Sequence, residues 1–219
     1  MSDNKVYKID CHTHPLSHSY YPGYCTRKEL TNSDKRNIET IIKQGIERKL
    51  DAIAITDHNI CTSGIYGKEY VKENKLPIVV VPGCECSVFF DNTEIHILAL
   101  GITEEFDLTK DDPISQVITS IHGASGIAIL AHPHYYSSLY PKLIKYVDGF
   151  EYYNGVNAVI YPGNEYFTLF DADKEKCIKT WGSDYHMTNM LLEEQRNAVV
   201  KISKENAPAL WKRIQLAAK

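Results

Sequence analysis

The chain has 219 residues, a length at which one α/β domain buries most of the surface that its unfolded form exposes. Its 24 basic and 28 acidic residues give a formal charge of −4 and are spread evenly, which offers no electrostatic basis for a dedicated nucleic-acid or membrane-surface protein. No apolar stretch approaches the roughly 18 residues that span a bilayer, and the N-terminus lacks the order of a signal peptide. We therefore expect a cytoplasmic protein with a single domain over residues 1–219.

Short apolar runs predict the strands of a mostly parallel sheet, because helical segments separate them as in crossover connections. Seven core strands are expected, at residues 6–9, 52–56, 78–81, 127–131, 149–153, 178–181 and 198–202. The alternation breaks at residues 86–100, where two extended stretches flank Asp91-Asn92, a hairpin-like turn signal. Seven such strands come close to a (β/α) barrel interrupted by one insertion.

The segments between these runs have helical periodicity. In residues 33–50, for example, Ile38, Ile41 and Ile42 follow the i, i+3, i+4 pattern, with Asn32 or Ser33 as the expected N-cap. Further helices are expected at residues 64–74, 113–125, 137–146, 163–176 and 206–218.

Possible metal ligands follow the apolar runs. His12 and His14 end the first run, and alternate residues of an extended strand point to the same side, so both imidazoles can reach one ion. Later runs are followed by His58, Glu85, His132, Asp184 and His186. A lone His-x-His pair also fits ordinary hydrogen-bonding residues, but its recurrence with other ligand types at several strand ends, where barrel enzymes carry their chemistry, favours a metal centre.

The six cysteines fit no zinc-finger spacing, and without a secretory signal we expect reduced thiols. Cys84 and Cys86 flank Glu85 on a predicted strand, so their side chains should face away from the glutamate and pack behind the site.

Together these residues resemble the PHP (polymerase and histidinol phosphatase) family of metal-dependent phosphoesterases. Four signatures of the family occur in order over nearly the whole chain, namely Asp-Cys-His12-Thr-His14, Ile-Thr-Asp57-His58, Ala-His132-Pro and Gly-Ser-Asp184-Tyr-His186. Glu85 and His96 match further family positions. The resemblance implies an α/β fold, a distorted seven-stranded (β/α)7 TIM-like barrel, with two or three metal ions on its C-terminal face.

The resemblance also implies how the ligands are shared. One ion would take His12, His14, Glu85 and Asp184, and a second would take Glu85, His96 and His132, with Glu85 as the bridge. A third would take His58 and His186 with a ligand from the loop after His14. The acidic residue common at that place is Ser19 here, so His18 is the expected substitute.

Two neighbouring cations can lower the pKa of a shared water and neutralise the charge that grows on a phosphate, so the expected nucleophile is a metal-bound hydroxide. Mixed imidazole and carboxylate ligands suit Zn, Mn or Fe equally.

Residues around the expected ligands have alternative roles. Asp57 either orients a ligand or manages a proton, or it is purely structural, and His134 either reaches the substrate phosphate or is an ordinary loop residue. Arg27 and Arg196 are candidate phosphate-binding side chains, with a plain surface role as the alternative. Asn154 is a candidate for the pocket lining.

Tyrosines such as Tyr135 and Tyr136 fall in segments that should border the metal face, where they could stack a base or sugar or simply pack the loops. The expected function is hydrolysis of a small phosphomonoester, such as a sugar, amino-alcohol or nucleotide phosphate, without nucleic acid or a membrane as partner. The alternatives are a phosphodiesterase or exonuclease acting on nucleic-acid ends, and a domain that binds metal or a phosphorylated ligand without turnover.

Overall fold

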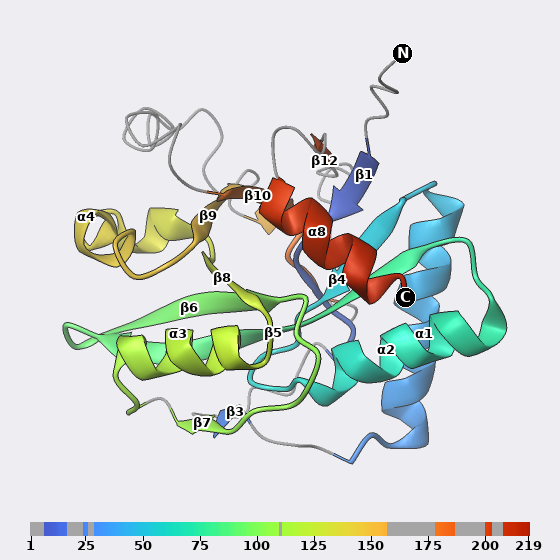
Figure 1. The fold of residues 1–219 in the computed structure, drawn as a ribbon, viewed down its shortest axis with the longest axis horizontal. Coiled ribbons are helices and arrows are strands. Elements are labelled where there is room, and N and C mark those ends of the chain that lie inside the picture. The colour runs from blue at the N-terminus through green and yellow to red at the C-terminus, as the bar shows by residue number, and fades with distance from the viewer. Residues whose placement is uncertain are drawn as a thin grey trace.

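The fold is built on a mixed parallel and antiparallel β-sheet that curls into a nearly closed barrel (Figure 1). The computed structural model describes residues 7–16, 24–25, 29–109, 111–156, 178–186, 200–202 and 208–219. Eight strands form the sheet, in the order β10, β9, β8, β6, β5, β4, β1, β12. Their bounds are β1 Tyr7–Asp10, β4 Ala52–Ile55, β5 Val79–Phe90, β6 Thr93–Leu100, β8 Ile127–Leu130, β9 Gly149–Asn154, β10 Ile178–Gly182 and β12 Val200–Ile202.

Each of the seven expected strands corresponds to a strand of this sheet, and the expected barrel-like α/β class is confirmed. The eighth strand is β6, which returns from β5 through Asp91 and Asn92, two residues with positive φ of 47° and 61° that suit a tight hairpin. The hairpin is not an appendage, because β6 lies between β5 and β8 and pairs antiparallel with both. β12 also runs antiparallel, beside β1, whereas β4 and β9 pair in parallel with both of their neighbours.

The barrel closes where β1 meets β10. The Cys11 amide donates to the Trp181 carbonyl over 3.0 Å, and the Asp184 amide donates to the His12 carbonyl over 2.9 Å. Just beyond, β2 (Thr13–His14) pairs in parallel with β11 (Tyr185–His186). The first and last signatures therefore lie side by side although they are far apart in the sequence.

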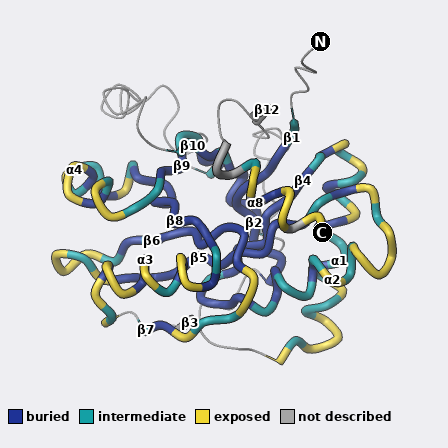
Figure 2. The backbone as a smooth tube through the Cα atoms, in the orientation of Figure 1, coloured by how far each residue is buried: buried dark blue, intermediate teal, exposed yellow. Residues whose placement is uncertain are grey.

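One apolar cluster fills the inside of the barrel, and the strands are the most deeply buried part of the molecule (Figure 2). α8 (Pro208–Ala217) contributes Trp211 and Ile214 to this cluster. Trp211 packs on Tyr7, the first residue of β1, with ring centroids 4.0 Å apart. Because Val79 and Ile178, the first residues of β5 and β10, belong to the same cluster, α8 covers the end of the barrel where the strands begin. The opposite end is left for the site.

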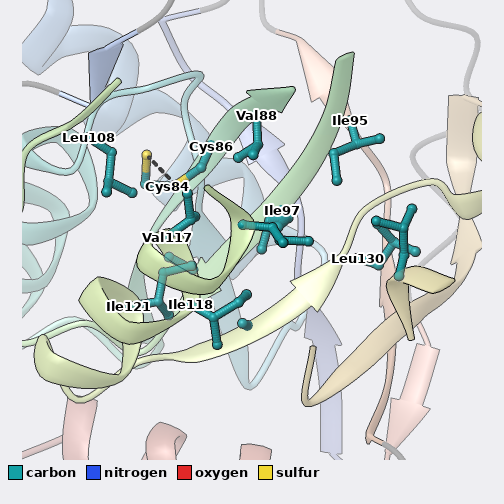
Figure 3. Packing of buried hydrophobic residues seen from close by; sticks show 14 of the residues in the cluster. Cys84, Cys86, Val88, Ile95, Ile97, Leu108, Val117, Ile118, Ile121 and Leu130 are labelled. Carbon is teal, nitrogen blue, oxygen red and sulfur yellow. Dashed lines mark hydrogen bonds between the residues drawn. The ribbon is translucent and has the colours of Figure 1, made fainter. Parts of the chain in front are cut away.

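Helices cover the outside of the sheet. α1 (Asn32–Glu47) and α2 (Thr62–Asn74) pack on β4 and β5, and α3 (Ile114–Gly123) packs on the β5–β6 hairpin and β8. Cys84 and Cys86 lie in this outer layer, against Val117 of α3 (Figure 3). Both thiols are free and buried in this apolar cluster, whereas Glu85 faces the histidines, so the prediction that they face away from Glu85 is confirmed.

Two helix predictions need correction. The N-cap of α1 is Thr31, not Asn32 or Ser33, because the Thr31 hydroxyl accepts from the Asp34 amide while the Asp34 carboxylate accepts from the Thr31 amide. The helix expected at residues 137–146 is only α4 (Tyr140–Leu143), preceded by the 3-10 turn η1 (Pro133–Tyr136). Pro141 lies in the first turn of α4, where its lack of an N–H is tolerated. The helix expected at residues 163–176 lies outside the described residues. The remaining short strands, β3 (Tyr24–Cys25) and β7 (Leu108–Thr109), pair with each other.

Candidate metal centre

Eight of the nine predicted ligands converge at the open end of the barrel. The eight are His12, His14, His58, Glu85, His96, His132, Asp184 and His186. Six of them follow the ends of β1, β4, β8 and β10, whereas Glu85 lies in the middle of β5, not at its end as expected, and His96 lies on β6. The ninth, His18, lies outside the described residues.

Glu85 occupies the middle of this group and is fully buried. Its Oε1 atom lies 2.9 Å from His132 Nε2 and 3.1 Å from His96 Nδ1. Its Oε2 atom lies 2.8 Å from His58 Nδ1. His12 and His14 place their Nε2 atoms 3.4 Å from the same carboxylate. A single carboxylate thus faces five imidazoles, the arrangement that a bridging ligand between cations requires.

Three clusters of ligand atoms lie close enough together to hold an ion: His12 with His14 and Glu85; His58 with Glu85 and His96; and His14 with His58 and His186. Asp184 Oδ1 adds to the first, 3.2 Å from His14 Nε2. His132 Nε2 lies 3.2 Å from His96 Nδ1, so Glu85, His96 and His132 also come together as predicted. Beside His58 and His186 the structure places His14.

The unsatisfied atoms of this group fit a metal. Among the described residues, His12 Nε2 and both ring nitrogens of His14 are buried without a hydrogen-bond partner. Buried polar atoms are rarely left in this state, because each one costs about 1–3 kcal/mol. Divalent cations would satisfy these donor atoms, and neutral imidazole with carboxylate is a common donor set for Zn, Mn and Fe.

For several histidines, a neighbouring side chain contacts one ring nitrogen, and this contact decides that the other ring nitrogen faces the centre. Glu151 Oε1 lies 3.0 Å from His12 Nδ1, so His12 presents Nε2. Glu94 Oε1 lies 3.4 Å from His96 Nε2, so His96 presents Nδ1. Tyr136 in turn has its hydroxyl 3.1 Å from Nδ1 of His132, which presents Nε2. Such outer partners fix the ring orientation and the tautomer of metal-binding histidines.

Glu151 has the widest reach of these supporting residues. It is fully buried, and its Oε2 atom accepts from the His132 amide over 2.8 Å and from Asn154 Nδ2 over 2.9 Å. The same Asn154 nitrogen donates to Asp184 Oδ2 over 3.1 Å. Glu151 therefore connects three of the converging residues. The sequence analysis missed it, although its place on the strand before Asn154 was a usable signal.

Electrostatics keep the carboxylates ionised. Burial alone would raise the pKa of Glu85, but the surrounding imidazoles, His58 foremost, hold it well below its usual value. Burial likewise opposes a charge on His96, yet Glu85 and Glu94 outweigh it and raise the His96 pKa to about 10. Burial and the neighbouring histidines lower the pKa of His14. When no ion is bound, the positive charge of protonated histidines such as His96 balances the negative charge of the carboxylates. Cations could take the place of these protons.

Two of the converging residues have strained backbones. His132 has a φ of 27° and Asp184 a φ of 54°, which residues with a side chain rarely adopt. Strain of this kind collects at functional sites, where the surrounding structure enforces it. Asp10 contributes to that enforcement: its buried carboxylate accepts from the Ser183 amide over 2.9 Å and from the His12 amide over 3.2 Å.

The other predicted site residues differ in where they lie relative to the centre. Asp57 is buried and its Oδ1 accepts from the Leu16 amide over 2.8 Å, holding the chain just after His14. Asn154 is buried behind Asp184 rather than lining the pocket. His134 lies on η1, and burial lowers its pKa. Arg27 and Arg196 lie outside the described residues.

A pocket of about 390 Å³ opens over the centre. Six converging residues line it together with Glu94, Tyr135 and Tyr136; the six are His58, Glu85, His96, His132, Asp184 and His186. A cavity of about 430 Å³ near the starts of β4 and β5 contains none of the predicted ligands, so we place the chemistry in the smaller pocket.

The sequence profile of the PHP domain matches residues 28–212 of the chain. The chain belongs to the PHP domain family. The match begins after His12 and His14, and it is the folded barrel that brings these two to the other signatures. Membership of the family supports a phosphoester hydrolase, and the clustered imidazole and carboxylate atoms could hold divalent ions.

Curated relatives match parts of this PHP protein. The 5′-3′ exoribonuclease Rnm of Salmonella typhimurium is 33% identical over 64 residues, which are 29% of this chain and 22% of that protein. Rnm of Escherichia coli is 31% identical over a stretch of the same length. The uncharacterised protein MJ1587 of Methanocaldococcus jannaschii is 29% identical over 128 residues, 58% of this chain and 68% of that one. The chain thus spans about a fifth of the length of either Rnm protein.

Solved structures share the fold over most of the chain. A protein from Bifidobacterium adolescentis assigned as a metal-dependent phosphoesterase has a TM-score of 0.62 at 14% identity, covering 94% of this chain and 96% of its own. An amidohydrolase from Chromobacterium violaceum with bound sulfate has a TM-score of 0.57 at 15% identity, covering 88% and 97%. Within the described residues, none of the helices combines the length and apolar character needed to cross a membrane.

Proposed function

We propose that this PHP protein hydrolyses a small phosphomonoester, such as a sugar, amino-alcohol or nucleotide phosphate, at a centre of two or three divalent ions. The observation that carries the proposal is the position of Glu85, whose two oxygens face different sets of imidazoles. A pocket of about 390 Å³ is at the small end of the range for ligand sites, about 300–1,000 Å³. This volume suits a small ester better than a long polymer.

The ligand sets that we propose follow the clusters. His12, His14, Glu85 and Asp184 would hold one ion, and Glu85, His96 and His132 a second. His58 and His186 would hold a third; His14 lies beside them, and His18 is still the predicted additional ligand. The donor set is compatible with Zn, Mn or Fe.

Ions bound there would supply an activated water and neutralise charge on the phosphate. The protein's part is to hold the ligands and to keep the site dry. Glu151, Glu94 and Tyr136 orient three imidazoles from behind, so little rearrangement is needed when an ion binds. Burial of Glu85 and Asp184 keeps water from competing for the carboxylates. Asp57 and His134 stay candidates for handling a proton, and Arg27 and Arg196 for contacting the phosphate.

A second candidate function is hydrolysis of RNA from its 5′ end, which the similarity to Rnm over 64 residues favours. Because of this similarity, the expectation that the protein does not act on nucleic acid is not supported. The formal charge of −4 and the small pocket favour the monoester.

The experiment is to measure metal content by element and then phosphate release from a panel of small monoesters, before and after chelation and after metals are added back. Two or more equivalents of metal, with turnover that is lost on chelation and restored by metal, would support the proposal. A metal-loaded protein that releases mononucleotides from 5′-phosphorylated RNA but no phosphate from any monoester would establish the second candidate instead.

A further inference from the structure

The cavity at the opposite end of the barrel from the metal centre has a lining suited to a ligand of its own. It measures about 430 Å³, within the range of small-molecule sites. Its walls are α2, the starts of β4 and β5, and the residues that follow α8 (Figure 1). Because β4 and β5 run from this cavity toward the metal centre, a ligand in one site does not block the other.

Positive charge dominates the lining of this cavity. Among the described residues, the lining has one acidic side chain, Asp51, and four lysines, namely Lys68, Lys72, Lys75 and Lys219. Even with the carboxyl group of Lys219 counted as negative beside Asp51, a surplus of positive charge is left, in a protein whose formal charge is −4. Like charges held close together repel one another, and an anion between them removes this repulsion. The lining therefore favours an anionic ligand.

Three of the lysines come from one face of α2, and hydrogen bonds position two of them. Lys68, Lys72 and Lys75 follow one another at intervals of four and three residues, and Lys75 is the C-cap of the helix. Lys68 Nζ donates to the Leu216 main-chain oxygen over 3.5 Å, and Lys72 Nζ donates to that of Lys219 over 3.1 Å. An ammonium group has three donors, so each of these bonds leaves two for a ligand. The same bonds join two walls of the cavity.

The floor of the cavity is apolar. Ile78 and Val80 are buried in the cluster that also contains α1, and Val71 and Leu76 are partly buried against it. An organic ligand would cover this apolar surface, whereas an inorganic ion would leave it in contact with water. The cavity therefore fits an anion that carries an apolar body.

The number of lysines indicates which anionic group the cavity takes. A carboxylate has a single negative charge, whereas a phosphate monoester carries about −1.5 to −2 at neutral pH and has three accepting oxygens. Several ammonium groups around one space match the phosphate better, and lysine is a common phosphate-binding residue.

We propose that this cavity is a second ligand site, which binds a small organic phosphate. The phosphate lies between the ammonium groups of Lys68, Lys72 and Lys75, and the apolar body lies on Val71 and Leu76. The proposal is independent of the proposed function, because none of these residues is a predicted metal ligand.

The test uses anilinonaphthalene sulfonate, an apolar anion whose fluorescence rises when it leaves water, titrated into the metal-loaded protein. Naphthyl phosphonate has no ester bond to hydrolyse and should displace this probe. Two competitors separate its two parts, since naphthoate keeps the apolar rings with a single charge and methylphosphonate keeps the doubly charged group without the rings. Displacement should need about 10-fold less naphthyl phosphonate than methylphosphonate, and less than naphthoate.

Lys75→Gly is the most informative variant, because Lys75 has a φ of 51°, at which glycine is unstrained. The variant should stay folded and bind naphthyl phosphonate about 2-fold to 5-fold more weakly, the size expected for one exposed charge pair. Adding Lys72→Ala should weaken binding further by a similar factor. Lys49→Gly is the matched control, because Lys49 is also exposed, has a φ of 59° just after α1, and does not line the cavity.

Several results would overturn the proposal. They are no displacement of the probe at millimolar naphthyl phosphonate, equal displacement by all three competitors, and equal losses of affinity in Lys75→Gly and Lys49→Gly. Binding that is lost in Asp184→Ala but kept in Lys75→Gly would place the phosphonate at the metal centre and would also overturn it. Phosphate release from the monoester panel tests the proposed function separately, so failure of one proposal is distinguishable from failure of the other.

Discussion

Replacing Glu151 by glutamine is the sharpest test of how the centre is held together. Three N–H groups point at this buried carboxylate, from His12 Nδ1, the His132 amide and Asn154 Nδ2. A carboxylate accepts on both oxygens, whereas a glutamine has one accepting oxygen and an NH2 group that faces another donor. Glu151→Gln must therefore leave at least one of these donors unpaired, on the His12 side or on the His132 side.

The magnitude follows from those contacts. An unpaired buried donor costs about 1–3 kcal/mol, so we expect the metal-free variant to lose roughly that much stability toward urea. Loss of an outer partner of a metal-binding histidine typically weakens metal binding by about 10-fold to 100-fold. We expect a loss of this size for the ion held by His12, measured by competition with a chromophoric chelator. Hydrolysis should recover when the metal is supplied in large excess.

A control is Asp148→Ala, which removes an accepting carboxylate elsewhere in the fold. The Asp148 carboxylate also accepts from a backbone amide, that of Ala128, and contacts His122, but it does not touch the centre. Its variant should lose stability without losing metal affinity. If Glu151→Gln behaves in the same way, unfolding more easily but binding metal as tightly as the unaltered protein, then Glu151 only supports the fold and the reasoning is wrong.

Three further outcomes are expected. Asp184→Ala should abolish phosphate release while the protein stays folded, and unchanged turnover would exclude the proposed centre. Gly182→Ala should weaken both metal binding and stability, because its new Cβ would press directly against His12 and lie 2.5 Å from Glu151 Oε1; crystallography or chelator competition would show whether the pair separates. Metal uptake should strengthen as pH rises from 6 toward about 10, because His96, with its pKa raised to about 10, must release a proton to bind an ion. Calorimetry in buffers of different ionisation heat measures that proton, and metal uptake independent of pH would contradict the assignment.

The ligands were predictable because their signal is local. A ligand-type residue at the end of an apolar run can be read without knowing which strands are neighbours, and His12, Glu85 and His132 are all found in this way. The supporting residues are different. Glu151 acquires its role from partners 139 residues away at His12 and 19 away at His132, and no short pattern encodes those distances. The same limit explains β6: its sequence marks a hairpin, but its place between β5 and β8 depends on strand pairing across the fold.

Small differences between the predicted and observed positions, such as that of the N-cap of α1, also have physical causes. Thr31, Asn32 and Ser33 can all cap a helix, and the choice among them is made by the reciprocal bond with Asp34. For the third proposed ion site, the family resemblance implied a ligand from the loop after His14, and the structure also brings His14 itself into the group, with its ring centroid 4.1 Å from that of His186.

The closure of the barrel imposes an order on its assembly. One edge of β1 is completed by β12 and by the end of β10, both of which are synthesised long after β1 leaves the ribosome. Before β12 and β10 are made, the backbone groups on this edge of β1, next to His12 and His14, have no partner strand. Unpaired strand edges of this kind can pair with other chains. This edge of β1, and with it the position of His12 and His14, is therefore completed only after most of the chain has been synthesised.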